Sequence, residues 1–298
     1  MSELSPRPYI LVGIDGSTSA LHALDWAVRE AQLRNLPVRL VHAVDYSSFA
    51  MGFDPGVSES FFKHLEEAGQ RFLDEAKEQV HAVDSAVEVS SVRSSGRPAQ
   101  ILLDLSKSAF VTVVGSSGLN GFTGLLAGSV AVALSAHGHS PVVVVRAPGV
   151  PVDGPVVVGI CGAPESEDAV GWAFEEASMR GADVVAVHVS RFTPAFYYSE
   201  PPWEDLIGAA GEEQHRMLLA ERLAGWQEKF PDVAVRRIVV TGNPAQVLLS
   251  HSQHAQLLLV GSHGHGAAAG LLLGSTSHRL IHHAPCPVLI ARPHARKS

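Results

Sequence analysis

The stretch VVGSSGLNGFTGLLAGSV, residues 113–130, decides the fold. It begins with the valines of a buried β-strand, continues through five glycines, and ends on a Gly-Ser pair typical of a helix start. Glycines let main-chain N–H groups turn toward a ligand without a Cβ in the way, and a helix start favours an anion. The pattern therefore indicates a phosphate-binding loop, and a plain connection between two elements is the alternative.

The same pattern returns at residues 258–276 as LLVGSHGHGAAAGLLLGST. Both copies read G-x2-G-x9-G-S, and each residue of the motif lies 146 positions from its counterpart. The same offset relates VGIDG at 12–16 to VGICG at 158–162, Trp26 to Trp172, His42 to His188, Pro98 to Pro244 and Arg146 to Arg292. A constant offset of this size indicates one duplicated domain rather than a solenoid. Because both loops keep the same register, a phosphate cradle is favoured over a plain connection.

Short apolar runs alternate with helical periodicity in the first repeat. Strands are expected at residues 9–14, 38–44, 87–92, 110–115 and 142–146, and helices at 19–34, 58–82, 98–107 and 129–138. The Val-rich runs lack regular polar alternation, which is typical of parallel strands buried on both faces. The sequence therefore predicts two tandem, doubly wound α/β domains with helices on both faces of each sheet. Their expected limits are 1–147 and 156–298, with a Pro- and Gly-rich linker at 148–155.

Composition narrows the class of protein. The chain has 298 residues, of which 46% are hydrophobic and 17% are charged, as in a globular protein. The formal net charge is −8 and the only basic run is RPHARKS at 292–298, so no nucleic-acid partner is expected. No apolar run reaches the ~20 residues of a membrane span and the first ten residues do not resemble a secretory leader. We therefore expect a cytoplasmic protein with no membrane contact and two free cysteines.

The duplicated glycine motif after a Val-rich fourth strand, together with VGIDGS at 12–17 and LVHAV at 40–44, resembles the universal stress protein family. The resemblance covers nearly the whole chain and is to the tandem two-domain form found in mycobacteria and other actinobacteria. It implies two Rossmann-like domains of the adenine nucleotide alpha hydrolase-like type, each with five parallel strands in the order 3-2-1-4-5. It also implies that ATP binds between the first and fourth strands.

Carried over residue by residue, the resemblance assigns roles around an ATP molecule with or without Mg²⁺. In the first domain, Gly13, Asp15 and the backbone of Ala43 would face adenosine, Gly115, Gly118 and Gly121 would line the ribose and phosphate path, and Gly128 and Ser129 would hold the distal phosphates. In the second domain the corresponding residues are Gly159, Val189, Gly261, Gly264, Gly274 and Ser275. Asp15 has an alternative role as a turn or cap residue before the first helix.

The second domain departs from the pattern because Cys161 stands where the first has Asp15. A thiol is a poor substitute for a carboxylate as a hydrogen-bond acceptor. We therefore expect the second site to keep its phosphate cradle and to hold adenosine less firmly. His263 and His265 lie within the second loop and either contact phosphate or point to solvent.

The leading functional hypothesis is a nucleotide-dependent regulator of stress response or growth, with no catalytic residues. The alternative class is a slow ATP hydrolase or nucleotidyl transferase. Fast phosphoryl transfer needs a cation at the transferring phosphate, and no Lys or Arg occurs within 115–129 or 261–275. Neither a Gly-Lys-Ser/Thr loop nor a G-x-G-x-x-G after the first strand is present, which disfavours P-loop and NAD-type sites. A flavoprotein electron carrier built on a similar sheet is a third alternative, and it would be yellow, whereas a protein with bound ATP is colourless.

His278 and His282 are spaced as a helical metal-ligand pair would be. No Glu or Cys completes a set at suitable spacing, so the sequence favours histidines that cap a helix end, and no metal is expected.

The last strand of each domain, in PVVVVR at 141–146 and PVLIAR at 287–292, has an apolar edge that needs a partner. In the resembled family this strand pairs two domains, so we expect an internal pseudo-dimer, and a homodimer of whole chains beyond it.

Overall fold

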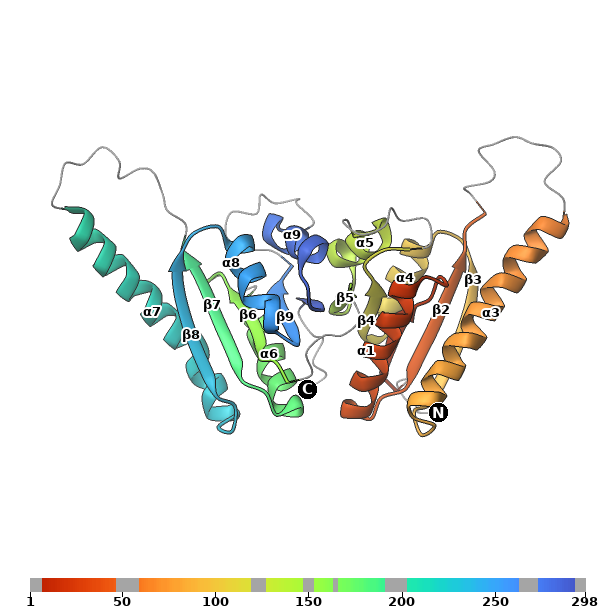
Figure 1. The fold of residues 1–298 in the computed structure, drawn as a ribbon, viewed down its shortest axis with the longest axis horizontal. Coiled ribbons are helices and arrows are strands. Elements are labelled where there is room, and N and C mark those ends of the chain that lie inside the picture. Colours follow the sequence, from red (N-terminus) through yellow and green to blue (C-terminus); the bar gives the residue numbers. More distant parts are fainter. Residues whose placement is uncertain are drawn as a thin grey trace, which may run out of the picture. The chain divides into compact units, whose positions relative to one another are not determined.

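A computed structural model of the chain describes residues 7–46, 59–118, 127–146, 153–162, 166–190, 203–262 and 273–292, with the backbone alone at 59 and 203–210. The described residues divide into two compact units, 7–146 and 153–292 (Figure 1). No helix within the described residues combines the length and the apolar character needed to cross a membrane.

The first unit is built on a five-stranded parallel sheet in the order β3-β2-β1-β4-β5. Its strands are β1 (Tyr9–Gly13), β2 (Val38–Val44), β3 (Val89–Ser95), β4 (Ala109–Gly115) and β5 (Val142–Val145). Its helices are α1 (Thr18–Arg34), α3 (Glu59–Val83), α4 (Pro98–Ser106) and α5 (Ser129–His137). α1 packs against α3, and α4 packs against α5, so right-handed crossovers place one pair on each face of the sheet. The fold predicted from the sequence, with the strand order of the resembled family, is confirmed.

The second unit repeats this architecture with the sheet order β8-β7-β6-β9-β10. Its strands are β6 (Val156–Ile160), β7 (Val184–Ser190), β8 (Val235–Thr241), β9 (Leu257–Gly261) and β10 (Val288–Ala291). Its helices are α6 (Glu167–Arg180), α7 (Trp203–Lys229), α8 (Pro244–His251) and α9 (Ser275–His283), with a short 3-10 turn η3 (Ser252–His254). β7, β8, α9 and β10 each begin and end 146 positions after their counterparts in the first unit.

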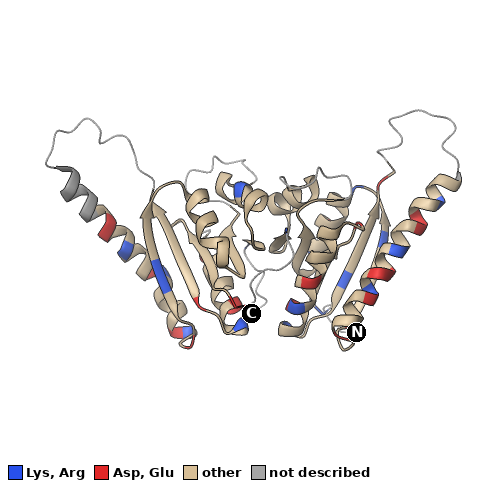
Figure 2. Cartoon of the chain, viewed as in Figure 1, with Lys and Arg blue, Asp and Glu red and all other residues tan. Residues whose placement is uncertain are grey.

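Burial explains why most strands match the sequence prediction and one does not. β1 and β4 carry no charged residues, nor do their counterparts β6 and β9 (Figure 2), and every residue of β5 and β10 is buried. β3 alternates between half-buried and exposed positions because it is an edge strand, and its last residues, Ser94 and Ser95, give no apolar signal. The sequence therefore placed this strand at 87–92, a few residues too early.

Each unit also contains a buried ion pair between two residues that lie one helical turn apart. Glu176 and Arg180 of α6 form it in the second unit, where Arg180 Nε donates to Glu176 Oε2 over 2.8 Å. Glu30 and Arg34 of α1 are the equivalent pair in the first unit. The side chains of the two glutamates are at most 1% exposed and those of the two arginines at most 12%. The sequence analysis did not foresee these pairs, although a Glu and an Arg recur four residues apart in both repeats.

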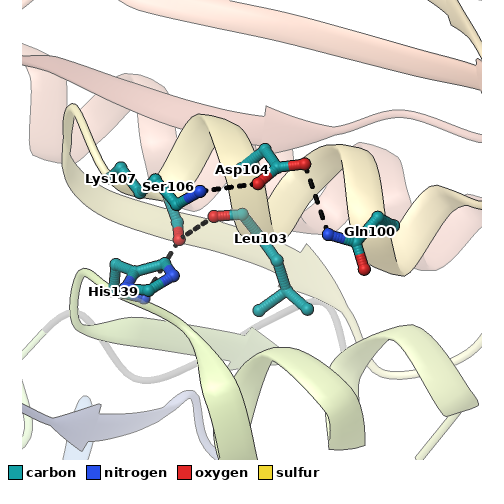
Figure 3. A network of polar contacts seen from close by, with 6 residues as sticks. All are labelled: Gln100, Leu103, Asp104, Ser106, Lys107 and His139. Carbon is teal, nitrogen blue, oxygen red and sulfur yellow. Dashed lines mark hydrogen bonds and ion pairs between the residues drawn. The ribbon is translucent and has the colours of Figure 1, made fainter.

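A polar network fastens the end of α4 to the turn that follows α5 (Figure 3). Ser106 Oγ donates to the carbonyl of Leu103 over 2.7 Å and accepts the main-chain N–H of His139 over 3.0 Å. Beside it, Lys107 Nζ lies 2.7 Å from Asp104 Oδ1. The Lys107 and Gln100 side chains both donate to Asp104, which lowers the pKa of its carboxyl. The network lies where α4 ends, on the approach to the first residue of β4, away from the carboxyl ends of the strands.

Replacing Lys107 by alanine is expected to raise the pKa of Asp104 toward its ordinary value, because the largest stabilising contact of the carboxylate is removed. Since the pKa is lowered in the folded protein, the stabilisation is present above the unfolded-state pKa and disappears as the pH falls through the folded-state pKa. Both side chains are more than half exposed, so the effect on stability is small. An NMR titration of the Asp104 carboxyl carbon in the two proteins measures the shift.

Candidate functional site

The candidate site of the first unit lies at the carboxyl ends of β1 and β4. These strands are neighbours, and the chain order reverses between them because β2 lies on the other side of β1. Such a switch point leaves a crevice outside the strand ends, where ligands of open α/β sheets bind. Gly13 is the last residue of β1 and Gly115 is the last residue of β4.

Asp15 and Gly118 meet at this crevice from opposite sides. A Cβ added to Gly118 would lie 2.6 Å from Asp15 Oδ2, so a side chain at position 118 would require the carboxylate to shift. Asp15 Oδ1 accepts the main-chain N–H of Ser17 over 2.9 Å, which is the turn role considered from the sequence. The two roles coexist because each uses a different oxygen, and Oδ2 faces the glycine loop.

Two serines fasten the beginning of the glycine loop to the start of α1. Ser17 is the N-cap of α1 and accepts the N–H of Ala20 over 3.2 Å. Its hydroxyl and that of Ser19 both donate to the carbonyl of Ser117. These contacts hold the loop beside Asp15. These serines were not predicted as positioning residues, although their cluster in DGSTS at 15–19 was the available signal.

The need for glycine at position 115 has a packing reason. A Cβ there would lie 2.4 Å from Ser19 Oγ and 2.6 Å from the carbonyl carbon of Ser19, so a side chain would push α1 off the sheet. The close approach brings the amino-terminal end of α1 and the loop together at one edge of the sheet. Any contact of Gly115 with a ligand stays a prediction.

The far end of the loop returns to its beginning. Gly128 donates its main-chain N–H to the carbonyl of Ser116 over 2.6 Å, and in the second unit Gly274 donates to Ser262 over 2.8 Å. Each of these amides closes its loop, and the predicted role of both glycines in holding phosphate stays a prediction. A Cβ on Gly128 would lie 3.9 Å from the nitrogen of Gly118, so the two loop ends lie side by side.

The available amides belong instead to the first turn of α5. Val132 donates to the carbonyl of Gly128 over 3.1 Å, as an α-helix requires, and residues 129–131 precede this first helical bond. Their N–H groups have no acceptor within the helix and point out of its positive end, where an anion is favoured. Ser129 is exposed there and presents a hydroxyl. Ser275 occupies the same position on α9.

The remaining predicted residues lie on the second strands or outside the described residues. Ala43 is half-buried near the carboxyl end of β2 and pairs with Ser94, and Val189 has the same place on β7. In the preceding residue, His42, Nδ1 of the ring forms a hydrogen bond with the carbonyl oxygen of Ile14 over 2.8 Å. The predicted residues Gly121, Gly264, His263 and His265 lie outside the described residues.

The second site differs from the first beside Cys161, which is partly exposed just after β6. Gly159 lies within β6 and Gly261 ends β9, and their contact with a ligand stays a prediction. Arg222 of α7 reaches the turn after Cys161, where its Nη2 donates to the carbonyl of Gly162 over 3.1 Å. Arg222 Nη1 also lies 3.8 Å from Glu167 Oε2, so this guanidinium joins the turn after Cys161 to the start of α6. The sequence analysis did not find Arg222 because it lies 61 residues from Cys161.

Ser277 ties the second site together from α9. Its buried hydroxyl donates to the carbonyl of Gly261 over 2.7 Å. The start of α9 is thus fixed against the end of β9, the strand that precedes the second glycine loop.

Comparison with known proteins assigns the family. The model of the universal stress protein family matches residues 8–146 and again residues 154–292, once for each unit. The chain belongs to the universal stress protein family. A universal stress protein of Mycolicibacterium smegmatis is 38% identical over 293 residues, covering 95% of this chain and 97% of the relative. A universal stress protein of Mycobacterium tuberculosis is 38% identical over 290 residues, covering 95% and 96%.

Solved structures of universal stress proteins share the fold. One from Archaeoglobus fulgidus has a TM-score of 0.68 and 18% identity, and covers 95% of this chain and 98% of its own. A putative universal stress protein from Pseudomonas aeruginosa has a TM-score of 0.62 and 14% identity, and covers 98% and 95%. At these identities the likeness concerns the fold.

Proposed function

We propose that this universal stress protein binds ATP at the carboxyl ends of β1 and β4 and acts as a nucleotide-dependent regulator of stress response or growth. The observation that carries the proposal is the approach of Asp15 Oδ2 to Gly118, where a side chain would displace the carboxylate. A carboxylate at this point accepts hydrogen bonds from ribose hydroxyls, and the start of α5 attracts the phosphates. The two groups are joined by the closed glycine loop.

The residues present fit a triphosphate better than they fit a catalytic centre. The amides of residues 129–131 and the Ser129 hydroxyl offer donors to phosphate, and the hydroxyl is also suited to a Mg²⁺ ion held between phosphates. No Lys or Arg lies in either glycine loop of the sequence, so a transferring phosphoryl group would lack its usual cation. We therefore propose that the protein reports nucleotide occupancy and does not turn ATP over rapidly. We expect the protein to be located in the cytoplasm and to form a homodimer.

Mass spectrometry of the nucleotide released from the denatured, purified protein tests this proposal. We expect ATP, at up to two molecules per chain, and a colourless protein. Absence of any adenine nucleotide, both after purification and after incubation with ATP, would contradict the proposal, as would a bound yellow flavin. A phosphate-release assay on the same sample separates regulator from enzyme, because turnover at ~1–100 per second is typical of kinases.

The two cysteines provide a probe of the second site. Cys286 is 2% exposed and burial raises the pKa of its thiol to about 12, so it stays protonated at pH 8. Cys161 is partly exposed. A thiol reagent is therefore expected to label one thiol per native chain rapidly and two after unfolding, because the thiolate is the reactive form.

Saturating ATP is expected to slow the labelling of Cys161, because the thiol lies where adenosine would bind in the second unit. The Cys161→Ser variant identifies the labelled residue, since the native variant should have no thiol that reacts rapidly. Equal labelling rates with and without ATP would show that the second site does not bind nucleotide at Cys161.

A further inference from the structure

Two histidines of α9 bring their outer ring nitrogens together. Nε2 of His278 lies 3.3 Å from Nε2 of His282, and the ring centroids are 4.4 Å apart. The residues are four apart on the helix, so they share one face. His278 is exposed to solvent, whereas His282 is 7% exposed and its backbone lies in the last turn.

The helix dipole does not explain this arrangement. Histidines at a helix C-terminus are stabilised by the negative end of the dipole, an effect limited to the last turn. His282 and His283 lie in that turn, but His278 is the fourth residue of a nine-residue helix and lies nearer its positive end. The sequence interpretation of capping histidines therefore covers His282 and His283 but not His278, which the structure instead pairs with His282 through a hydrogen bond between their Nε2 atoms.

The separation of the two nitrogens fits a shared metal ion. With Zn–N bonds of about 2.05 Å, two nitrogens 3.3 Å apart subtend about 107° at the ion, close to the tetrahedral angle. His283 does not complete the set, because its ring lies 6.2 Å from that of His282 and it is the next residue along the helix. No cluster of three or more His, Cys, Asp or Glu suited to a metal occurs in the described part of the chain. Water would fill the remaining coordination positions.

We propose that His278 and His282 chelate a divalent transition-metal ion such as Zn²⁺, Ni²⁺ or Cu²⁺ through their Nε2 atoms. Imidazole nitrogen suits these ions, and the affinity order places Cu²⁺ above Zn²⁺ and Ni²⁺. The site is specific to the second unit, because Val132 and Ala136 occupy the equivalent positions on α5. It lies on the face of a helix and does not depend on the proposed binding of ATP.

Metal titration of the full-length, nucleotide-free protein tests the site. Cu²⁺ is followed by electron paramagnetic resonance and Zn²⁺ by competition with a chromogenic chelator. We expect one strong site per chain with two nitrogen ligands, and at least tenfold weaker binding in His278→Val. The His283→Ala variant is the matched control and should bind as the unchanged protein does. His278 is exposed, so its replacement is not expected to unfold the unit, which circular dichroism checks.

The first unit allows the reverse experiment. Introducing both Val132→His and Ala136→His on α5 should raise the stoichiometry from one strong site to two, because the helix bounds are equivalent. Equal affinity for metal in the unchanged protein and in His278→Val would overturn the proposal, since binding would then occur elsewhere among the 16 histidines. Absence of a strong site in the unchanged protein would also overturn it.

Discussion

Replacing Arg180 by methionine is expected to lower the free energy of unfolding of the second unit by about 3–5 kcal/mol, because the carboxylate of Glu176 would stay buried without its main cation. The side chain of Glu176 is 0% exposed and that of Arg180 is 12% exposed. In the folded protein the two charges are in direct contact, with Arg180 Nη2 2.8 Å from Glu176 Oε2. Urea denaturation followed by circular dichroism measures the loss.

A surface pair on α7 provides the control for this experiment. Arg216 and Glu212 have the same four-residue spacing and a separation of 2.5 Å, but their side chains are 61% and 51% exposed. Replacing Arg216 by methionine should change stability by less than about 1 kcal/mol. If the two variants lost equal amounts, burial would not be the source of the effect.

Removing both charges of the buried pair separates its two contributions. The double variant Glu176→Leu with Arg180→Met should recover much of the stability lost in Arg180→Met, because no unpaired charge is then left in the interior. The same comparison at Glu30 and Arg34 tests the first unit. A double variant as unstable as Arg180→Met would show that packing, rather than the unpaired charge, causes the loss.

Replacing Asp15 by alanine is expected to weaken ATP binding at the first site by roughly 10- to 100-fold. The physical reason is the loss of a charged hydrogen-bond acceptor, worth about 1.5–3 kcal/mol, where each 1.4 kcal/mol is a factor of ten. Equilibrium dialysis with ATP measures the affinity, and because the second unit is the same in the unchanged protein and in Asp15→Ala, the difference between their binding curves belongs to the first site.

Two further variants separate binding from folding at this position. Asp15→Asn keeps an oxygen for the N–H of Ser17, so it should preserve the turn before α1 and lose the charge. Cys161→Asp gives the second unit the carboxylate of the first and should strengthen binding there. Unchanged affinity in both Asp15 variants would remove this carboxylate from the proposed site, even if ATP bound elsewhere.

The sequence determined the framework of the site because its signals are local. Strand ends, helix starts and the repeated glycines depend on residues close in the chain. The sequence could therefore place Gly115 at the end of β4, and Gly128 and Ser129 at the start of α5. The 146-residue offset then transferred each placement to the second unit. β3 was misplaced because an edge strand with exposed residues lacks the apolar pattern on which such predictions depend.

Only the tertiary structure decided how distant residues use these positions. Asp15 and Gly118 are 103 residues apart in sequence and meet because β1 and β4 are neighbours in the sheet. The Gly128 amide closes the loop onto Ser116, a contact that the sequence could not show. The sequence could show that His278 and His282 share a helix face, but rotamers and packing decide that their Nε2 atoms lie 3.3 Å apart. Periodicity fixes which elements form, whereas side-chain direction and long-range contact depend on how those elements pack.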